Sequence, residues 1–322
     1  MCTVFKTNLY KDQCFYVGKN YDAPDPCRIM VCVNPPGVEK RALIAPPEEP
    51  VTWRSHYGSI TCNQVCKDFP VSGMNEAGLV VEQTTLWNTV YPDRDDRPAI
   101  KETQWIQYIL DTCATTAEVI ESSKGIRISQ EAARLQYFIC DSGGDVCVIS
   151  YIMGEMSLIR GGDMPHTVIA NDMYGTSLDY LGIHEGYGGR RKITPSDMSL
   201  DRFASAADAV ANHTYGEPED CFAALAGAAF DMTQWSIVYD PVHGSVLYRS
   251  KHDPEAKRVD LHDFDLGAMG APLARDMDEG RGDFTELTVE RNLELIRFFF
   301  EESRYFPDVQ VTGQDMEMLA RW

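Results

Sequence analysis

Short apolar runs, rich in β-branched and aromatic residues, dominate the first third of the chain and are interrupted by Asn, Asp, Gly and Pro. Runs of this kind between such breakers are typical of β-strands. The predicted strands cover residues 2–9, 14–19, 28–33, 57–62 and 79–84. If Lys11 and Asp12 form a two-residue turn, the numbers of paired residues sum to about 23. Cys2 is then expected opposite Tyr21.

Helical periodicity follows, because Trp105, Ile106, Ile109 and Leu110 fall on one face of a helix over residues 101–113. The remaining predicted elements are a helix over 116–122, strands over 135–140, 146–151, 157–159 and 166–170, helices over 200–212 and 217–232, a hairpin of 235–239 with 245–249, and a late helix over 287–303. This order favours an α+β fold with two sheets stacked between helical layers. With no internal repeat or linker, we expect residues 1–322 to form a single domain.

The 322 residues include 49 acidic and 29 basic side chains, which give a formal net charge of -20. A protein that binds a nucleic-acid backbone needs a basic surface, so no nucleic-acid partner is expected. An anionic membrane surface is disfavoured for the same reason. No membrane-spanning helix is expected either, because the longest apolar runs are far below the roughly 18 residues needed to span a bilayer. No export signal is evident, so we expect a cytoplasmic protein whose ten cysteines stay reduced, mostly as small buried side chains.

Cys2 is the most informative residue. If Met1 is removed, Cys2 carries both a thiol nucleophile and a free α-amine that can act as its base. Lys19 falls on the same sheet face as Cys2 by the two-residue period, where its ammonium can lower the thiol pKa. Asp22 lies at the strand end, within reach of the α-amine. The residues alone leave a second interpretation open, in which Cys2 is an ordinary strand residue, Lys19 is solvated and Asp22 belongs to a turn.

Several short motifs occur in a fixed order and together resemble one family. They are Met1-Cys2-Thr3, Gly18-Lys19-Asn20-Tyr21-Asp22, Gly73-Met74-Asn75-Glu76-Ala77-Gly78-Leu79, Ala170-Asn171-Asp172 and Asp201-Arg202-Phe203. This set closely resembles the choloylglycine hydrolase family of linear amide C–N hydrolases. The family includes penicillin V acylases and bile salt hydrolases and is of the N-terminal nucleophile type.

The resemblance implies a four-layer αββα sandwich of two antiparallel sheets and a cofactor-free hydrolase acting on a small-molecule amide. It implies that Cys2 is the nucleophile and that Asp22 holds the α-amine. Lys19 stands where the family usually has Arg. Asn171 is implied as an oxyanion donor and Arg202 as electrostatic support. Relatives of this kind are usually homo-oligomers, so a tetramer or a dimer is expected.

Thr85 departs from the family pattern, since its position is Asn in bile salt hydrolases and Tyr in penicillin acylases. The family's oxyanion hole draws on this position, and a backbone N–H there needs only a residue other than proline. Other substrates are therefore considered as well: N-acyl amino acids, acyl-homoserine lactones and ceramide-like lipids. A catalytically silent member that binds an acylated ligand is a further alternative.

Weaker signals lie elsewhere. Cys62 and Cys66 near His56 lack the spacing of a zinc site. The glycine-containing segment 182–189 and the basic residues 190–192 are typical of a surface loop, with binding of an anionic group as the alternative. Four aromatic residues can line an acyl pocket or belong to the core, namely Trp53, Tyr57, Phe69 and Trp87.

Overall fold

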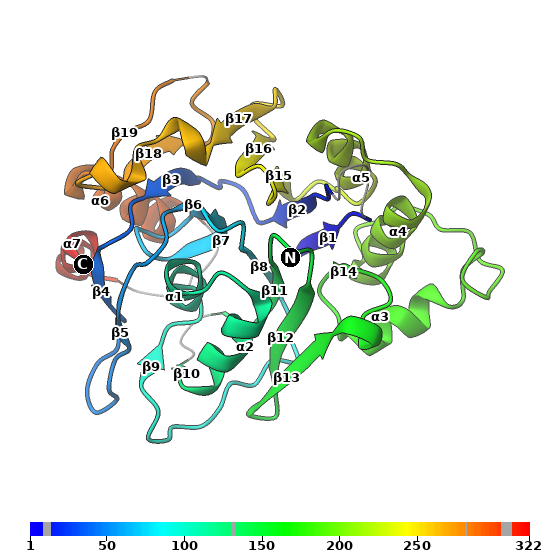
Figure 1. Ribbon diagram of the computed structural model, residues 1–322, viewed down its shortest axis with the longest axis horizontal. Helices are drawn as coiled ribbons and strands as arrows, with labels where there is room; N and C mark the ends of the chain where they lie inside the picture. The colour runs from blue at the N-terminus through cyan, green and yellow to red at the C-terminus, as the bar shows by residue number, and fades with distance from the viewer. Residues whose placement is uncertain (9–13, 130–132, 281, 304–310) are drawn as a thin grey trace.

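A computed structural model describes residues 1–8, 14–129, 133–280, 282–303 and 311–322. Within this part of the chain, two large sheets face each other and helices cover their outer faces (Figure 1). Every strand pair in these two sheets is antiparallel. The arrangement confirms the predicted α+β class with two antiparallel sheets.

The smaller of the two, sheet A, carries the N-terminus. Its strands in spatial order are β14 (Val168–Ile169), β1 (Cys2–Lys6), β2 (Val17–Asp22), β15 (Thr233–Asp240), β16 (Ser245–Ser250) and β17 (Lys257–Asp260). Helices α3 (Tyr174–Leu181), α4 (Ser199–Asn212) and α5 (Cys221–Gly227) follow β14 along the chain, and α4 packs on β1 and α5 on β2. Figure 1 shows these three helices on the same side of β1 and β2.

The larger sheet, sheet B, has the spatial order β13 (Glu155–Arg160), β12 (Val146–Ile152), β11 (Leu135–Cys140), β8 (Val80–Thr85), β7 (Pro70–Asn75), β6 (Ser59–Asn63), β3 (Met30–Asn34), β18 (Leu273–Asp276) and β19 (Thr285–Glu286). Helix α1 (Gln104–Thr112) packs on β7 and β8, and α2 (Thr116–Lys124) follows it. Two short strand pairs accompany the sheets: β4 (Glu39–Arg41) with β5 (Thr52–Arg54), and β9 (Ala99–Ile100) with β10 (Arg127–Ile128). Helices α6 (Val289–Arg297) and α7 (Gly313–Arg321) pack against each other near the C-terminus.

The register predicted for the first hairpin is confirmed. Cys2 pairs with Tyr21 and Val4 with Lys19. The turn residues Lys11 and Asp12 themselves lie outside the described residues. The second strand was predicted over 14–19, whereas β2 spans Val17–Asp22 in the structure.

Two predicted helices differ in the structure. The helix expected over 217–232 is a 3₁₀ turn (Pro218–Asp220) followed by the short helix α5, which ends at Gly227, a residue type that weakens a helix interior. The late helix begins at Val289, where the Thr288 hydroxyl accepts from the Arg291 N–H, and its last turn is a π-helix (Phe298–Glu302).

Strand β7 was not predicted, since it begins with proline and contains a glycine in its middle. Proline is tolerated there because it is the first residue of the strand. At Gly73, a Cβ atom would lie 2.6 Å from Leu110 Cδ1 and 2.9 Å from the Ile60 carbonyl oxygen. The glycine therefore allows α1 to pack closely on sheet B.

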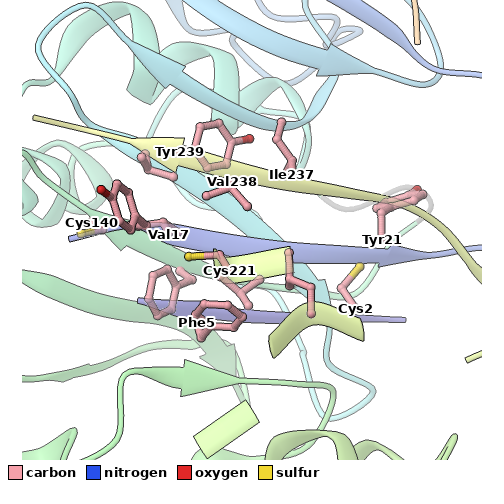
Figure 2. Close-up of a cluster of buried hydrophobic side chains, with 14 of the residues drawn as sticks. Cys2, Phe5, Val17, Tyr21, Cys140, Cys221, Ile237, Val238 and Tyr239 are labelled. Carbon is pink, nitrogen blue, oxygen red and sulfur yellow. The ribbon is translucent and has the colours of Figure 1, made fainter. Parts of the chain in front are cut away.

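The helices of the described part of the chain are all too short or too polar to cross a bilayer. Eight of the cysteines are buried, as expected for small apolar side chains: Cys2, Cys32, Cys62, Cys66, Cys113, Cys140, Cys147 and Cys221. Figure 2 shows Cys2 and Tyr21 on neighbouring strands within the buried cluster around sheet A.

Candidate active site

Cys2 begins strand β1 and its side chain is 1% exposed. Met1 extends the pairing by one residue, since its amino group donates to the Asp22 carbonyl (2.8 Å) and its carbonyl accepts from the Asp22 N–H (2.9 Å). The Cys2 N–H donates to Asn171 Oδ1 at 3.0 Å. The Cys2 nitrogen would become the α-amine after removal of Met1, and it already contacts the polar side chain of Asn171.

Asn171 follows β14 and connects three parts of the site. Its Oδ1 accepts from the Cys2 N–H and from Arg202 Nη2 (2.7 Å), and its Nδ2 donates to the Thr85 carbonyl at 2.8 Å. The Asn171 N–H donates to Ser199 Oγ at the start of α4. An amide nitrogen carries two N–H groups. Within the described part of the chain, the second of them makes no hydrogen bond.

Arg202 is fully buried and reaches sheet A from helix α4. Its Nη1 donates to Cys2 O (3.0 Å), Thr3 Oγ1 (2.9 Å) and Asp22 Oδ2 (3.0 Å). Side chains alternate between the two faces of a strand. Thr3 and Asp22 therefore face the helices, whereas the Cys2 side chain faces the other way, toward sheet B. Arg202 supports the backbone and the carboxylate behind the thiol.

Asp22 is buried next to this guanidinium. Burial raises the pKa of the Asp22 carboxyl, and this rise is opposed by the charge of Arg202 and by a hydrogen bond from Thr233 Oγ1 to Asp22 Oδ1 (2.7 Å). The carboxyl lies in the last residue of β2, as the sequence predicted. Its position beside Met1 places it near any amine freed at Cys2.

Thr85 ends strand β8, and its backbone faces away from the neighbouring strand β11. The Leu86 N–H donates to the Arg134 carbonyl. Backbone groups in an antiparallel pair alternate between the partner strand and the opposite side. Thr85, which is paired with Leu135, therefore turns its N–H and C=O away from β11. The carbonyl accepts from Asn171 Nδ2, so the Thr85 N–H points to the same side of the strand as the Asn171 amide.

Lys19 lies on the inner face of sheet A and is fully buried. Its Nζ donates to Glu82 Oε2 (2.5 Å) and to the Val71 carbonyl (2.7 Å), both in sheet B. The same ammonium lies 5.5 Å from the ring centre of Tyr21 and 5.6 Å from that of Trp235. The lysine that the sequence associated with the thiol is thus paired with a carboxylate of the opposite sheet.

Glu82 was missed by the sequence analysis. It is fully buried in β8, and its Oε1 accepts from the Ser72 hydroxyl, which lies 2.5 Å from the Tyr239 hydroxyl. Burial raises the pKa of Glu82, and the ammonium of Lys19 opposes that rise. The signal available in the sequence was an acidic residue directly after Val80 and Val81, in a strand otherwise suited to the core.

Two further residues of sheet B hold the Asn171 segment and were also missed. Thr84 Oγ1 donates to the Ala170 carbonyl at 2.6 Å, and Gln136 Nε2 donates to the same oxygen at 3.0 Å. Both side chains are buried. They fix the end of β14 against sheet B immediately before Asn171.

The weaker sequence candidates lie apart from Cys2. Trp53 is buried among a cluster that includes Trp105, Phe69 belongs to a different cluster near Met316, and Trp87 is 67% exposed. Trp53 and Phe69 thus belong to the core, which is one of the two interpretations that the sequence left open, and they lie in different clusters of it.

The other two weak signals differ in burial, since Cys62 and Cys66 are buried whereas the basic residues 190–192 are exposed. In the described residues, no group of three or more His, Cys, Asp or Glu side chains could hold a metal ion. In the basic segment, Arg191 Nη2 lies 3.7 Å from Asp201 Oδ1. A surface hollow of about 470 Å³ between α4 and α5 and another of about 500 Å³ beside β5 are lined by neither Cys2 nor Asn171.

Comparison with known proteins identifies the same family that the motifs resemble. Residues 2–222 match the family model of linear amide C–N hydrolases, choloylglycine hydrolase family. A penicillin V acylase from Pectobacterium atrosepticum is 25% identical over 177 residues, which cover 50% of this chain and 46% of that protein. The chain thus matches about half the length of this curated relative.

Two solved structures share the fold. A penicillin V acylase from Agrobacterium tumefaciens superposes with a TM-score of 0.73 at 23% identity, covering 85% of this chain and 90% of that chain. A conjugated bile acid hydrolase from Clostridium perfringens superposes with a TM-score of 0.71 at 14% identity, covering 87% and 98% of the two chains. Both likenesses cover more than four fifths of this chain, so the layered α+β fold is shared.

Proposed function

Since the chain belongs to the choloylglycine hydrolase family of linear amide C–N hydrolases, we propose that it hydrolyses a linear amide with Cys2 as its nucleophile. The observation that carries the proposal is the position of Asn171, whose amide contacts the Cys2 nitrogen and the Thr85 carbonyl at once. Asn171 thereby connects the backbone nitrogen of Cys2, the proposed base, to the strand end that carries the other proposed oxyanion donor.

Maturation comes first in the proposed mechanism. Hydrolysis of the Met1–Cys2 peptide bond converts the Cys2 N–H into a free α-amine. Such an amine has an ordinary pKa of about 7.7 to 8.0, so a useful fraction is unprotonated at neutral pH. It accepts the thiol proton of Cys2, and the Asp22 carboxylate and Asn171 Oδ1 hold the resulting ammonium.

Acylation then follows. The Cys2 thiolate attacks the amide carbonyl carbon, and the carbonyl oxygen becomes an oxyanion that accepts from Asn171 Nδ2 and from the Thr85 N–H. Collapse of the tetrahedral intermediate breaks the C–N bond, and the α-ammonium gives its proton to the leaving nitrogen. The products of this half are a free amine and an acyl thioester on Cys2.

Deacylation uses the same groups. The α-amine removes a proton from water, the hydroxide attacks the thioester carbonyl, and the same donors bind the second oxyanion. The C–S bond breaks, a carboxylic acid leaves, and the proton returns to the Cys2 sulfur.

The names of the similar proteins supply the first substrates to test. Penicillin V carries a phenoxyacetyl amide, and a glycine-conjugated bile acid carries a steroid acyl group. Because the Thr85 side chain matches neither subgroup, the panel also includes an N-acyl amino acid, an acyl-homoserine lactone and a ceramide.

The decisive experiment combines intact mass with turnover. We expect the purified protein to lack Met1, to hydrolyse at least one amide of the panel and to accumulate a covalent acyl adduct on Cys2. Cys2→Ala is expected to abolish both turnover and adduct, whereas Cys113→Ala, which alters another buried cysteine, retains them. Turnover that survives in Cys2→Ala, or a Met1-bearing protein that is fully active, contradicts the proposal.

A further inference from the structure

The pairing between β7 and β8 stops before β8 ends. The matched residues are Met74 with Val80, Gly73 with Val81 and Ser72 with Glu82, yet β8 continues to Thr85. Beyond the Ser72–Glu82 pair, no further residues of β7 and β8 are paired. The Thr85 N–H faces this side of β8. In the same register Thr85 would face Phe69, which precedes the start of β7 at Pro70, so this N–H has no partner in β7.

Lys19 lies at the point of separation. Its Nζ donates to the Val71 carbonyl, the first residue of β7 beyond the matched pairs, and to Glu82, the last matched residue of β8. A side chain of sheet A thus takes a hydrogen bond that a continuous sheet B would supply from its own backbone. The contact fixes both strands of sheet B against β2.

The same pair joins the two strands that carry the reacting groups. Lys19 is on β2, next to Cys2 on β1, and its side chain is on the same face as the Cys2 thiol. Glu82 is on β8, the strand that ends at Thr85. Moving Lys19 relative to Glu82 therefore moves the thiol relative to the proposed oxyanion donor.

Charge and burial favour a structural link over an electrostatic effect on the thiol. Both side chains are fully buried, and each neutralises the other at 2.5 Å. The second oxygen of Glu82 is held by Ser72. The charge of Lys19 is thereby balanced by a contact that points toward sheet B.

We propose that Lys19 and Glu82 form a positioning pair that sets the distance between the Cys2 thiol and the Thr85 N–H, and that Lys19 does not act by ionising the thiol. The inference rests on the proposed function, because it concerns the geometry of acylation at Cys2.

The test compares two reactions of the same sulfur. Acylation by p-nitrophenyl acetate needs both the thiolate and an oxyanion hole, whereas alkylation by iodoacetamide needs only the thiolate. Both are followed across pH by mass spectrometry of the tryptic peptide Cys2–Lys6, in the wild type, in Lys19→Met/Glu82→Leu and in Glu82→Gln. Lys257→Met, which removes another buried lysine of sheet A at β17, is the matched control.

We expect the pair variants to acylate Cys2 about tenfold to a hundredfold more slowly, the size of effect that a displacement of about 1 Å produces. The pH midpoint of alkylation is expected to stay at its wild-type value, and Lys257→Met is expected to react like the wild type. If the double variant does not fold, Glu82→Gln provides the test, because it keeps the size of the side chain. Its rate of acylation by p-nitrophenyl acetate is then compared with its rate of alkylation by iodoacetamide.

Two results overturn the inference. An alkylation midpoint that moves to higher pH together with slower acylation shows that Lys19 ionises the thiol, and unchanged acylation shows that the pair has no role in the reaction. Failure of the proposed function is recognised separately, because the wild type then shows no acylation of Cys2 at all, and the inference falls with it.

Discussion

Arg202 donates from Nη2 to Asn171 Oδ1 at 2.7 Å, and this contact determines which way the Asn171 amide faces. A guanidinium has only donors, so the oxygen of the amide must point to Arg202 and the nitrogen away from it. The Asn171 Nδ2 is thereby directed to the side of Thr85, where the proposed mechanism needs a donor.

Asn171→Ala is expected to lower kcat by about a hundred- to a thousandfold, the usual effect of removing one oxyanion donor. The best substrate of the amide panel provides the assay, and thermal unfolding shows whether the fold is kept. Asn171→Asp is the matched variant, since it keeps both acceptor contacts of Oδ1 but removes the N–H donors. An Asn171→Asp enzyme with wild-type kcat would falsify the donor role.

Thr85→Ala is expected to keep kcat within about threefold of the wild type, because the proposed donor is a backbone N–H that alanine also supplies. Thr85→Pro removes this N–H and is expected to reduce kcat about a hundredfold or more. Strand pairing with β11 is retained in both variants, since the Thr85 N–H faces away from β11. Equal rates in the two variants, with circular dichroism unchanged, would exclude the Thr85 N–H from the oxyanion hole.

The parts of the site that are close in sequence were predictable from it. Counting residues across the first hairpin places Cys2 opposite Tyr21, and the alternation of strand side chains puts Lys19 on the same face. Asn171 and Arg202 became candidates only through motif resemblance. Their hydrogen bond depends on the packing of α4 against β1 and β14, which no local pattern specifies.

The partner of Lys19 was unpredictable for a related reason. Lys19 and Glu82 are 63 residues apart and belong to different sheets. Local periodicity describes which side of a strand is buried but not which residue of the facing sheet meets it. An acidic residue in a buried strand implies a partner, because burial of an unpaired charge is costly. Its identity comes only from the stacking of the two sheets.

Asp201 gives a pH-dependent prediction. Burial alone would raise the pKa of Asp201, but hydrogen bonds from Ser196 Oγ and Tyr180 OH, each 2.6 Å, and the charge of Arg191 hold the pKa below its ordinary value. A carboxyl with a depressed folded-state pKa stabilises the fold above its ordinary pKa and loses that contribution as pH falls through the folded value. Asp201→Asn is therefore expected to lower the free energy of unfolding by about 1 kcal/mol at neutral pH.

Urea unfolding at about pH 7 and about pH 3 checks this expectation, since the difference between wild type and Asp201→Asn should shrink at the lower pH. Asp208→Asn, on the same helix, serves as the control for a general change of charge. A difference that is equal at both pH values would show that the hydrogen bonds of Asp201 do not depend on its ionisation.

Gln136 and Thr84 allow the position of Asn171 to be tested without touching a reacting group. Their side chains hold the Ala170 carbonyl at 3.0 Å and 2.6 Å, directly before Asn171. Gln136→Leu removes one of the two donors while Thr84 keeps the other, so we expect a folded protein in which kcat falls about tenfold as Asn171 loses its fixed position. Alkylation of Cys2 by iodoacetamide should fall less than kcat, because it needs no oxyanion donor and the α-amine keeps its proposed contact with Asp22. Gln64→Leu provides a contrast. Gln64 is buried and accepts a hydrogen bond from the Tyr21 hydroxyl, and the Tyr21 side chain lies on the same sheet face as the thiol. This variant is expected to affect alkylation and acylation alike. If Gln136→Leu reduced both reactions equally, the glutamine would act on the whole site and not through Asn171.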